Sequence, residues 1–135
     1  MANALFSSYR SQCLTADVDL DDSIVFVFVD HADDTPVPAT DDFLDDILGA
    51  ARVATSTALG TKTFTAGTFD AADHTVTAVT GDPFESIVLY DNTPGTEATK
   101  DLIAFIDTAT GLPTTPNGGD ITVAWDSGAN RIFNL

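Results

Sequence analysis

The sequence predicts a mostly β, single-domain fold: a β-sandwich of jelly-roll or immunoglobulin-like topology, or a small barrel, with one or two short helices. Two observations support this prediction. Short runs rich in valine, isoleucine, threonine and aromatic residues recur along the chain, and proline, glycine and asparagine separate them. The length of 135 residues corresponds to one domain, 1–135, which can bury a core without a metal or a disulfide. Within it we expect an N-terminal helix or arm at 1–16 and a β core over 23–135.

Residues 2–14 show a helical spacing of apolar side chains. Leu5, Tyr9 and Cys13 recur at every fourth position, which places them on one face of a helix. We therefore predict a short docked helix, with a loose N-terminal arm as the alternative. Cys13 is expected in the core and not as a nucleophile. As the single cysteine it cannot form an internal disulfide, which fits folding in a reducing cytoplasm, and a bridge between chains stays open.

Two segments, 24–29 and 102–106, are apolar at every position, so both faces of each predicted strand need cover. We expect them inside a sandwich or beneath a partner chain. Phe26 is expected in the core, where Phe26→Ala would cost about 3–5 kcal/mol of stability.

A second helix is predicted over residues 41–48. Thr40 precedes it as an N-cap, and Asp41 and Asp42 stand in the first turn, where the helix dipole favours negative charge. Gly49 is expected to end this helix.

The rest of the chain is β in character. Further strands are predicted at 52–55, 62–65, 68–69, 74–80, 84–90, 120–126 and 131–134. In 120–126 the side chains of Ile121, Val123 and Trp125 share one face, so Trp125 is expected in the core. Trp125→Ala should then cost as much stability as Phe26→Ala. The loop 108–119 is long for a hairpin and is a candidate for carrying a contact.

The charge is strongly negative, with 21 acidic and 5 basic residues and a net charge of −16. Residues 17–46 contain eleven aspartates and no lysine or arginine. Such a field repels phosphate, so we expect no nucleic-acid partner and no anionic membrane. It suits a basic protein partner, divalent cations or simple solubility. Residues 1–14 lack the pattern of a secretory signal, and the longest apolar run is too short to span a bilayer.

Asp17, Asp19, Asp21 and Asp22 resemble the start of a calcium-binding loop of the EF-hand type. The pattern fails at its sixth position, which is Asp22 in place of glycine, and at its twelfth, which is Phe28 in place of glutamate. A calcium site of another type stays open, and the alternative is a solvated acidic edge. We expect no metal and no cofactor.

No catalytic arrangement is evident among the candidate residues. The two histidines, His31 and His74, lack the spacing of a metal pair, and His74 could be partnered by Asp70 or Asp73. Ser127 lies in a turn sequence that lacks the preceding glycine of a nucleophile elbow. We therefore expect that the protein is not an enzyme.

Trp125 and Tyr90 could form an aromatic platform for a sugar on a β-sandwich. Trp125 shares its strand face with two aliphatic residues, which favours the core position over the platform.

Five stretches together resemble small structural proteins of the virions of tailed bacteriophages, and most closely head decoration, or cement, proteins. They are GTFDAAD at 67–73, VTG at 79–81, SIVLY at 86–90, LIAFID at 102–107 and NGGDITVAW at 117–125. The likeness covers the C-terminal half of the chain and extends loosely to 24–29.

The resemblance implies a β-rich, non-enzymatic protein on the outside of an assembled capsid. Its partners would be the major capsid protein and further copies of itself, as a dimer or trimer. It would be located at the capsid surface of the virion after assembly in the host cytoplasm. The alternative within the same virion is a tail or baseplate module that binds a host surface or glycan through the loop 108–119.

Overall fold

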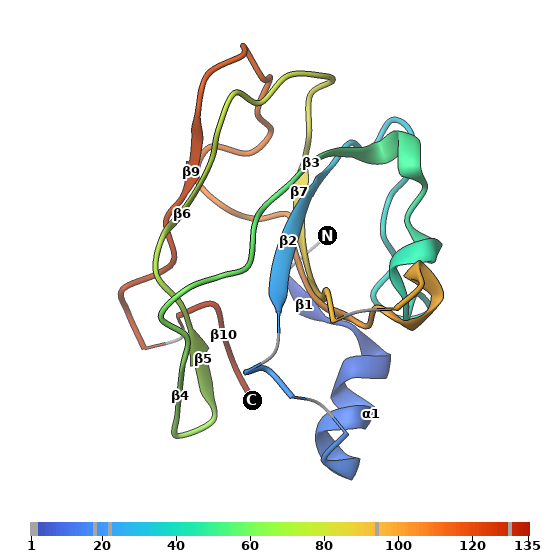
Figure 1. Ribbon diagram of the computed structural model, residues 1–135, viewed down its shortest axis with the longest axis vertical. Coiled ribbons are helices and arrows are strands. Elements are labelled where there is room, and N and C mark those ends of the chain that lie inside the picture. Colours follow the sequence, from blue (N-terminus) through green and yellow to red (C-terminus); the bar gives the residue numbers. More distant parts are fainter. Residues whose placement is uncertain (1–2, 18, 22, 94, 130) are drawn as a thin grey trace.

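Three antiparallel sheets and one short α-helix make up the computed structural model of the chain (Figure 1). The structure describes residues 3–17, 19–21, 23–93, 95–129 and 131–135. The predicted mostly β, single-domain, sandwich-like fold is confirmed. The barrel alternative is wrong, because the sheets formed by the described residues do not close on themselves.

A five-stranded sheet runs through the middle of the molecule in the order β1-β8-β7-β2-β3. Its strands are β1 (Ala4–Leu5), β2 (Ile24–Val29), β3 (Arg52–Thr55), β7 (Ser86–Asp91) and β8 (Leu102–Ile106). All six residues of β2 and four of the five in β8 are buried, which confirms both predictions. The two smaller sheets lie on one side of this sheet and the 3₁₀ segments on the other, so its central strands are covered on both faces (Figure 1).

The two smaller sheets use the short strands of the second half of the chain. One has the order β10-β5-β4 and the other pairs β6 with β9. Their bounds are β4 (Thr63–Thr65), β5 (Thr68–Asp70), β6 (His74–Val76), β9 (Ile121–Val123) and β10 (Phe133–Asn134). The ladder of β6 is shorter than the predicted 74–80 because Ala78 takes a positive φ of 52°, and its N–H donates to the side chain of Asp120 (3.0 Å).

Aromatic rings join the central sheet to the small ones. Phe26 is fully buried, as predicted, and forms T-shaped ring pairs with Trp125 and His74, with centroids 5.9 and 5.6 Å apart. Phe28 stacks on Phe84 with centroids 4.2 Å apart. Trp125 is only half-buried, so its predicted core position is confirmed as packing against the core and not as full burial.

The predicted N-terminal helix is present as α1 (Ser7–Thr15). It begins later than predicted, because residues 4–5 extend the central sheet as β1. The fully buried Phe6 makes the transition: its N–H donates to Ile103 O (3.1 Å), and the next N–H, of Ser7, donates to Pro38 O (2.8 Å). The loose-arm alternative is therefore wrong.

The helix predicted over 41–48 is absent. Phe43 bridges to Asp101, and two 3₁₀-helices follow, η1 (Leu44–Asp46) and η2 (Gly49–Ala51). Thr40 does not cap a helix, since its hydroxyl donates to the carboxylate of Asp41 (3.2 Å). Gly49 starts the second 3₁₀-helix and does not end an α-helix.

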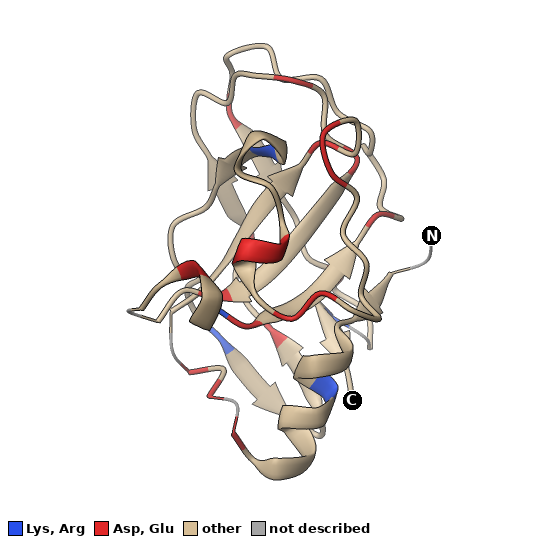
Figure 2. Cartoon of the chain, turned by 90° about the vertical axis from the view of Figure 1, so that its right-hand side faces the viewer, with Lys and Arg blue, Asp and Glu red and all other residues tan. Residues whose placement is uncertain are grey.

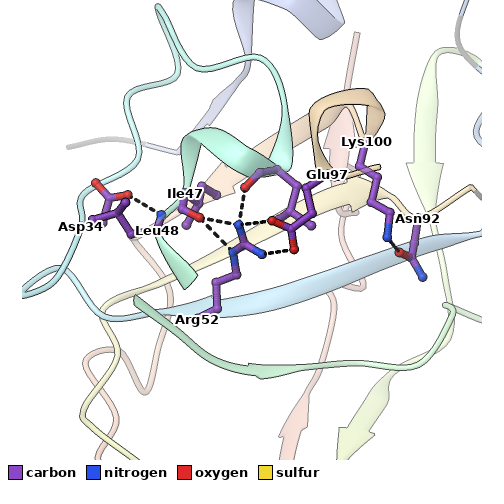
Figure 3. Close-up of polar contacts among 8 residues, drawn as sticks. Asp34, Ile47, Leu48, Arg52, Asn92, Glu97 and Lys100 are labelled. Carbon is purple, nitrogen blue, oxygen red and sulfur yellow. Dashed lines mark hydrogen bonds and ion pairs between the residues drawn. The ribbon is translucent and has the colours of Figure 1, made fainter. Parts of the chain in front are cut away.

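Backbone groups that would pair with each other in an α-helix form hydrogen bonds with side chains outside the segment instead (Figure 3). The Leu48 N–H, which would bond to Leu44 O in an α-helix, donates to Asp34 Oδ2 (2.8 Å). The guanidinium of Arg52 donates to Leu44 O (2.7 Å) and Ile47 O (2.6 and 2.9 Å). It also pairs with Glu97, the first residue of η3 (Glu97–Thr99), at 2.6 and 3.0 Å. These bonds hold the segment in two tight turns.

Candidate interaction surface

Exposed apolar side chains gather at one end of the molecule, between α1 and the β4–β5 hairpin. Both elements project at this end in Figure 1, with the last residues of the chain between them. Leu14 is 90% exposed, Leu135 63% and Phe64 49%. Cys13 and Leu20 are half-buried beside them. We call Cys13, Leu14, Leu20, Phe64 and Leu135 the end surface.

The end surface is hollowed by three adjoining grooves of about 550, 230 and 670 Å³, all of which are lined by Leu135. Leu20 and Phe64 line the first two, and Cys13 lines the first and third. The apolar surface is therefore continuous from the helix to the hairpin.

Packing against the core fixes α1 at its side of the end surface. Tyr9 is 1% exposed, and its ring meets the ring of Phe133 edge-on at 5.7 Å. Gln12 Nε2 donates to Asp101 Oδ1 (2.5 Å), which ties the helix to the start of β8. Leu14 lies outside the buried stripe and points into solvent.

Turn geometry fixes the hairpin at the other side. Ala66 and Gly67 have φ values of 53° and 78°, the pattern of a two-residue turn that matches the twist of the strands it joins. Phe64 lies opposite Phe69 in the β4–β5 register. Leu135 N donates to Gly67 O (2.9 Å), so the last residue is held against the turn.

A buried hydroxyl lies beneath the first groove. Tyr9 Oη has no hydrogen-bond partner among the described residues, and burial raises the pKa of Tyr9 above its usual range, with the neighbouring Cys13 thiol adding to the shift. Cys13 is half-buried at the groove wall, so its predicted place in the core is only partly correct.

The end surface carries few charges in a strongly acidic chain. In Figure 2, acidic segments spread over the loops of the face shown, and basic ones are few. Among the residues that the structure describes, the groove along α1 is lined by Arg10 and by no acidic side chain, and the groove at Gly67 by no charged side chain. Asp19 and Asp21 line the remaining groove.

The three described aspartates of the suggested calcium loop form no cluster of possible metal ligands. Asp17 Oδ2 accepts from Thr15 Oγ1 (2.7 Å), and Asp19 Oδ1 accepts from the N–H of Asp21 (2.9 Å). Asp22, the fourth residue of that prediction, lies outside the described residues.

Within the described ranges, one other trio of carboxylates, Asp30, Asp33 and Asp82, has oxygens within 4.8 Å of one another. Asp30 is buried, and its Oδ1 accepts from the N–H of Ala32 (2.7 Å). No sequence pattern predicts this trio, because Asp82 comes from a turn far along the chain from Asp30 and Asp33. Clustered carboxylates alone do not identify a metal site.

The histidines have structural partners. His31 Nε2 lies 2.8 Å from Ser86 Oγ, a pair that no sequence pattern indicated, because 55 positions separate the two residues. Ser86 is fully buried, so no substrate could reach its hydroxyl. The ring of His31 stacks on Phe105 with centroids 6.0 Å apart.

His74 has neither of its two predicted partners. Asp73 Oδ1 accepts from the N–H of Trp125 (2.9 Å), and Asp70 lies 3.6 Å from Arg131. His74 Nε2 instead lies 3.4 Å from Thr57 Oγ1. Ser127 is exposed in a turn, as expected.

The aromatic platform for a sugar is not formed. Tyr90 is 5% exposed, and burial raises the pKa of its hydroxyl. Trp125 presents its ring to Phe26, and its Nε1 is buried.

Comparison with known proteins adds no family: no family model matches the chain, and no curated protein matches it. Among the described residues, no helix is both long and apolar enough to cross a membrane.

Proposed function

We propose that this chain is a structural virion protein that binds the outside of an assembled phage capsid as a symmetric oligomer and stabilises it. The resemblance of its C-terminal half to decoration proteins suggests the location. The observation that supports a binding role is the end surface, where Leu14, Phe64 and Leu135 are exposed together on an otherwise acidic domain. Its partners would be the major capsid protein and copies of itself.

The physical basis of the stabilisation is mass action. A protein that binds only the assembled shell lowers the free energy of that state, and each bound copy adds to the effect. This role requires no active site. It requires a rigid domain with a surface that a partner can cover, and the sheet of β2, β7 and β8 provides the rigid domain.

Binding to purified heads that lack the protein tests this proposal. We expect saturable binding at a fixed ratio to the major capsid protein and a higher melting temperature of the decorated heads. Leu14→Glu is a suitable variant, because a side chain that is 90% exposed can be changed without disturbing the fold. Deleting residues 2–14 is unsuitable, because Phe6 and Tyr9 belong to the core. Heads that bind no protein would contradict the proposal.

The alternative, a tail or baseplate module that binds a host surface or glycan, would leave heads unbound and would give binding to host cells. A glycan array with the purified protein separates the two functions. The loop 108–119 is the segment whose replacement should abolish that binding.

A further inference from the structure

We infer that a second copy of this chain covers the end surface, so that Leu14, Phe64 and Leu135 lie at the contact between protomers. This inference rests on the proposed function and names the surface that forms its oligomer. The three side chains are the most exposed apolar part of one continuous, hollowed area. Such an area is covered in most proteins that function as assemblies.

The charge of the chain restricts where two copies can meet. Each copy carries −16, so contact through the aspartate-rich loops would bring like charges within the Debye length of about 8 Å. The grooves along α1 and at Gly67 avoid this cost, because no acidic side chain of a described residue lines either of them. The end surface is therefore where two acidic copies can approach closely.

The charges at the end surface are also self-complementary. Arg10 forms no ion pair with any residue that the structure describes. Arg52 and Arg131, by contrast, pair with Glu97 and Asp70. Asp19 and Asp21 line the first groove of the same surface, whereas Arg10 lines the third.

In a two-fold contact each surface meets its own copy, so one pair of opposite charges is formed twice. Arg10 of one protomer would face Asp19 or Asp21 of its partner. Other occupants fit less well: a nucleic acid or an anionic membrane is repelled by the acidic chain. A site on the major capsid protein is the remaining occupant, and the experiment below separates it from a second copy.

Sedimentation velocity of the purified protein over a range of concentrations is the direct test. We expect a monomer–oligomer equilibrium with a dissociation constant on the order of 1 μM or tighter. Leu14→Glu should weaken self-association by about tenfold or more, because it places a charge within the apolar contact.

The matched control is Leu48→Glu. Leu48 is 56% exposed and lies outside the end surface, so the substitution adds the same charge elsewhere and should leave the equilibrium unchanged. Far-UV circular dichroism checks that both variants are folded. Equal effects of the two substitutions would overturn the inference.

A charge exchange tests the orientation of the contact. Arg10→Glu alone should weaken association, and Arg10→Glu combined with Asp19→Arg and Asp21→Arg should restore it, because the opposite charges are then exchanged. Failure of the exchange to restore association would contradict the pairing.

Head binding, measured on the same variants, separates failure of this inference from failure of the proposed function. Wild-type protein that stays monomeric, yet loses head binding on Leu14→Glu, would overturn the second copy as occupant and support the proposed function. Protein that self-associates through the end surface but never binds heads would support this contact and contradict the proposed function.

Discussion

The ring of Phe64 stacks on the ring of Phe69, with centroids 5.5 Å apart and planes inclined by 16°. The two residues are partners in the β4–β5 register but differ in exposure: Phe69 is 2% exposed and Phe64 49%. One ring therefore completes the core, and the other begins a surface that extends over Leu135 to α1. Folding of the single chain leaves this surface open to water, and this is the structural basis for proposing an assembling protein.

The core should respond unequally to loss of its two prominent aromatic residues. Phe26→Ala is expected to cost about 3–5 kcal/mol, because the side chain is fully buried. Trp125→Ala should cost less, about 2 kcal/mol, because part of the ring remains in water. Denaturant unfolding of both variants measures the difference. An equal loss, or a loss below about 1 kcal/mol for Phe26→Ala, would show that the packing described here is wrong.

Arg52 should be essential to the fold of the segment that replaces the predicted helix. Arg52→Met removes its hydrogen bonds to Leu44 O and Ile47 O and its ion pair with Glu97, and we expect a loss of about 2–3 kcal/mol. Arg52→Lys should recover little, because a single ammonium cannot reproduce the planar fork of donors. Thermal unfolding checks both, and full recovery by lysine would contradict this role.

The same ion pair should give a defined pH dependence. The hydrogen bond and charge of Arg52 lower the pKa of Glu97 below its usual range. The ion pair therefore contributes to the free energy of unfolding above the unfolded-state pKa of glutamate, about 4.3. This contribution is lost as the pH falls through the lower folded-state pKa of Glu97. The melting temperatures of wild type and Glu97→Gln should differ near pH 7 and converge in strong acid. The difference will be small because Glu97 is exposed, and a difference that persists unchanged to pH 2 would contradict the ion pair.

A substitution in the β4–β5 turn should raise the stability of the protein. Ala66 adopts a φ of 53°, which asparagine tolerates better than alanine, and Asn-Gly is the preferred sequence for this turn. Ala66→Asn is therefore expected to raise the stability by about 0.5–1 kcal/mol. Ala66→Val serves as the control and should destabilise, since branching at Cβ opposes a positive φ. Chemical denaturation measures both, and stabilisation by valine would rule out the turn described.

Local sequence signals account for the parts of the fold that were predicted correctly. In β2 and β8 every position is apolar, so burial on both faces follows whatever the neighbouring strands are. The helix predicted over 41–48 does not form. The pattern that predicts it involves only neighbouring residues, whereas the side chains that bind its backbone come from outside the segment. The side chains of Asp34 and Arg52 form hydrogen bonds with backbone groups of this segment, and these bonds cannot be predicted from the spacing of its apolar residues.

The end surface could not be found from the sequence, because Leu14, Phe64 and Leu135 come from three distant segments. Two weak signals were present. Leu14 lies beside the predicted apolar stripe of its helix, and Phe64 is an aromatic residue between the exposed Thr63 and Thr65.

Copy number in purified virus particles tests the central proposal, capsid decoration, most directly. Quantitative mass spectrometry would compare this chain with the major capsid protein. Capsid decoration predicts a ratio close to a simple fraction of the capsid subunit, so that the chain is among the abundant virion proteins. A handful of copies per particle, or none, would contradict decoration of the capsid.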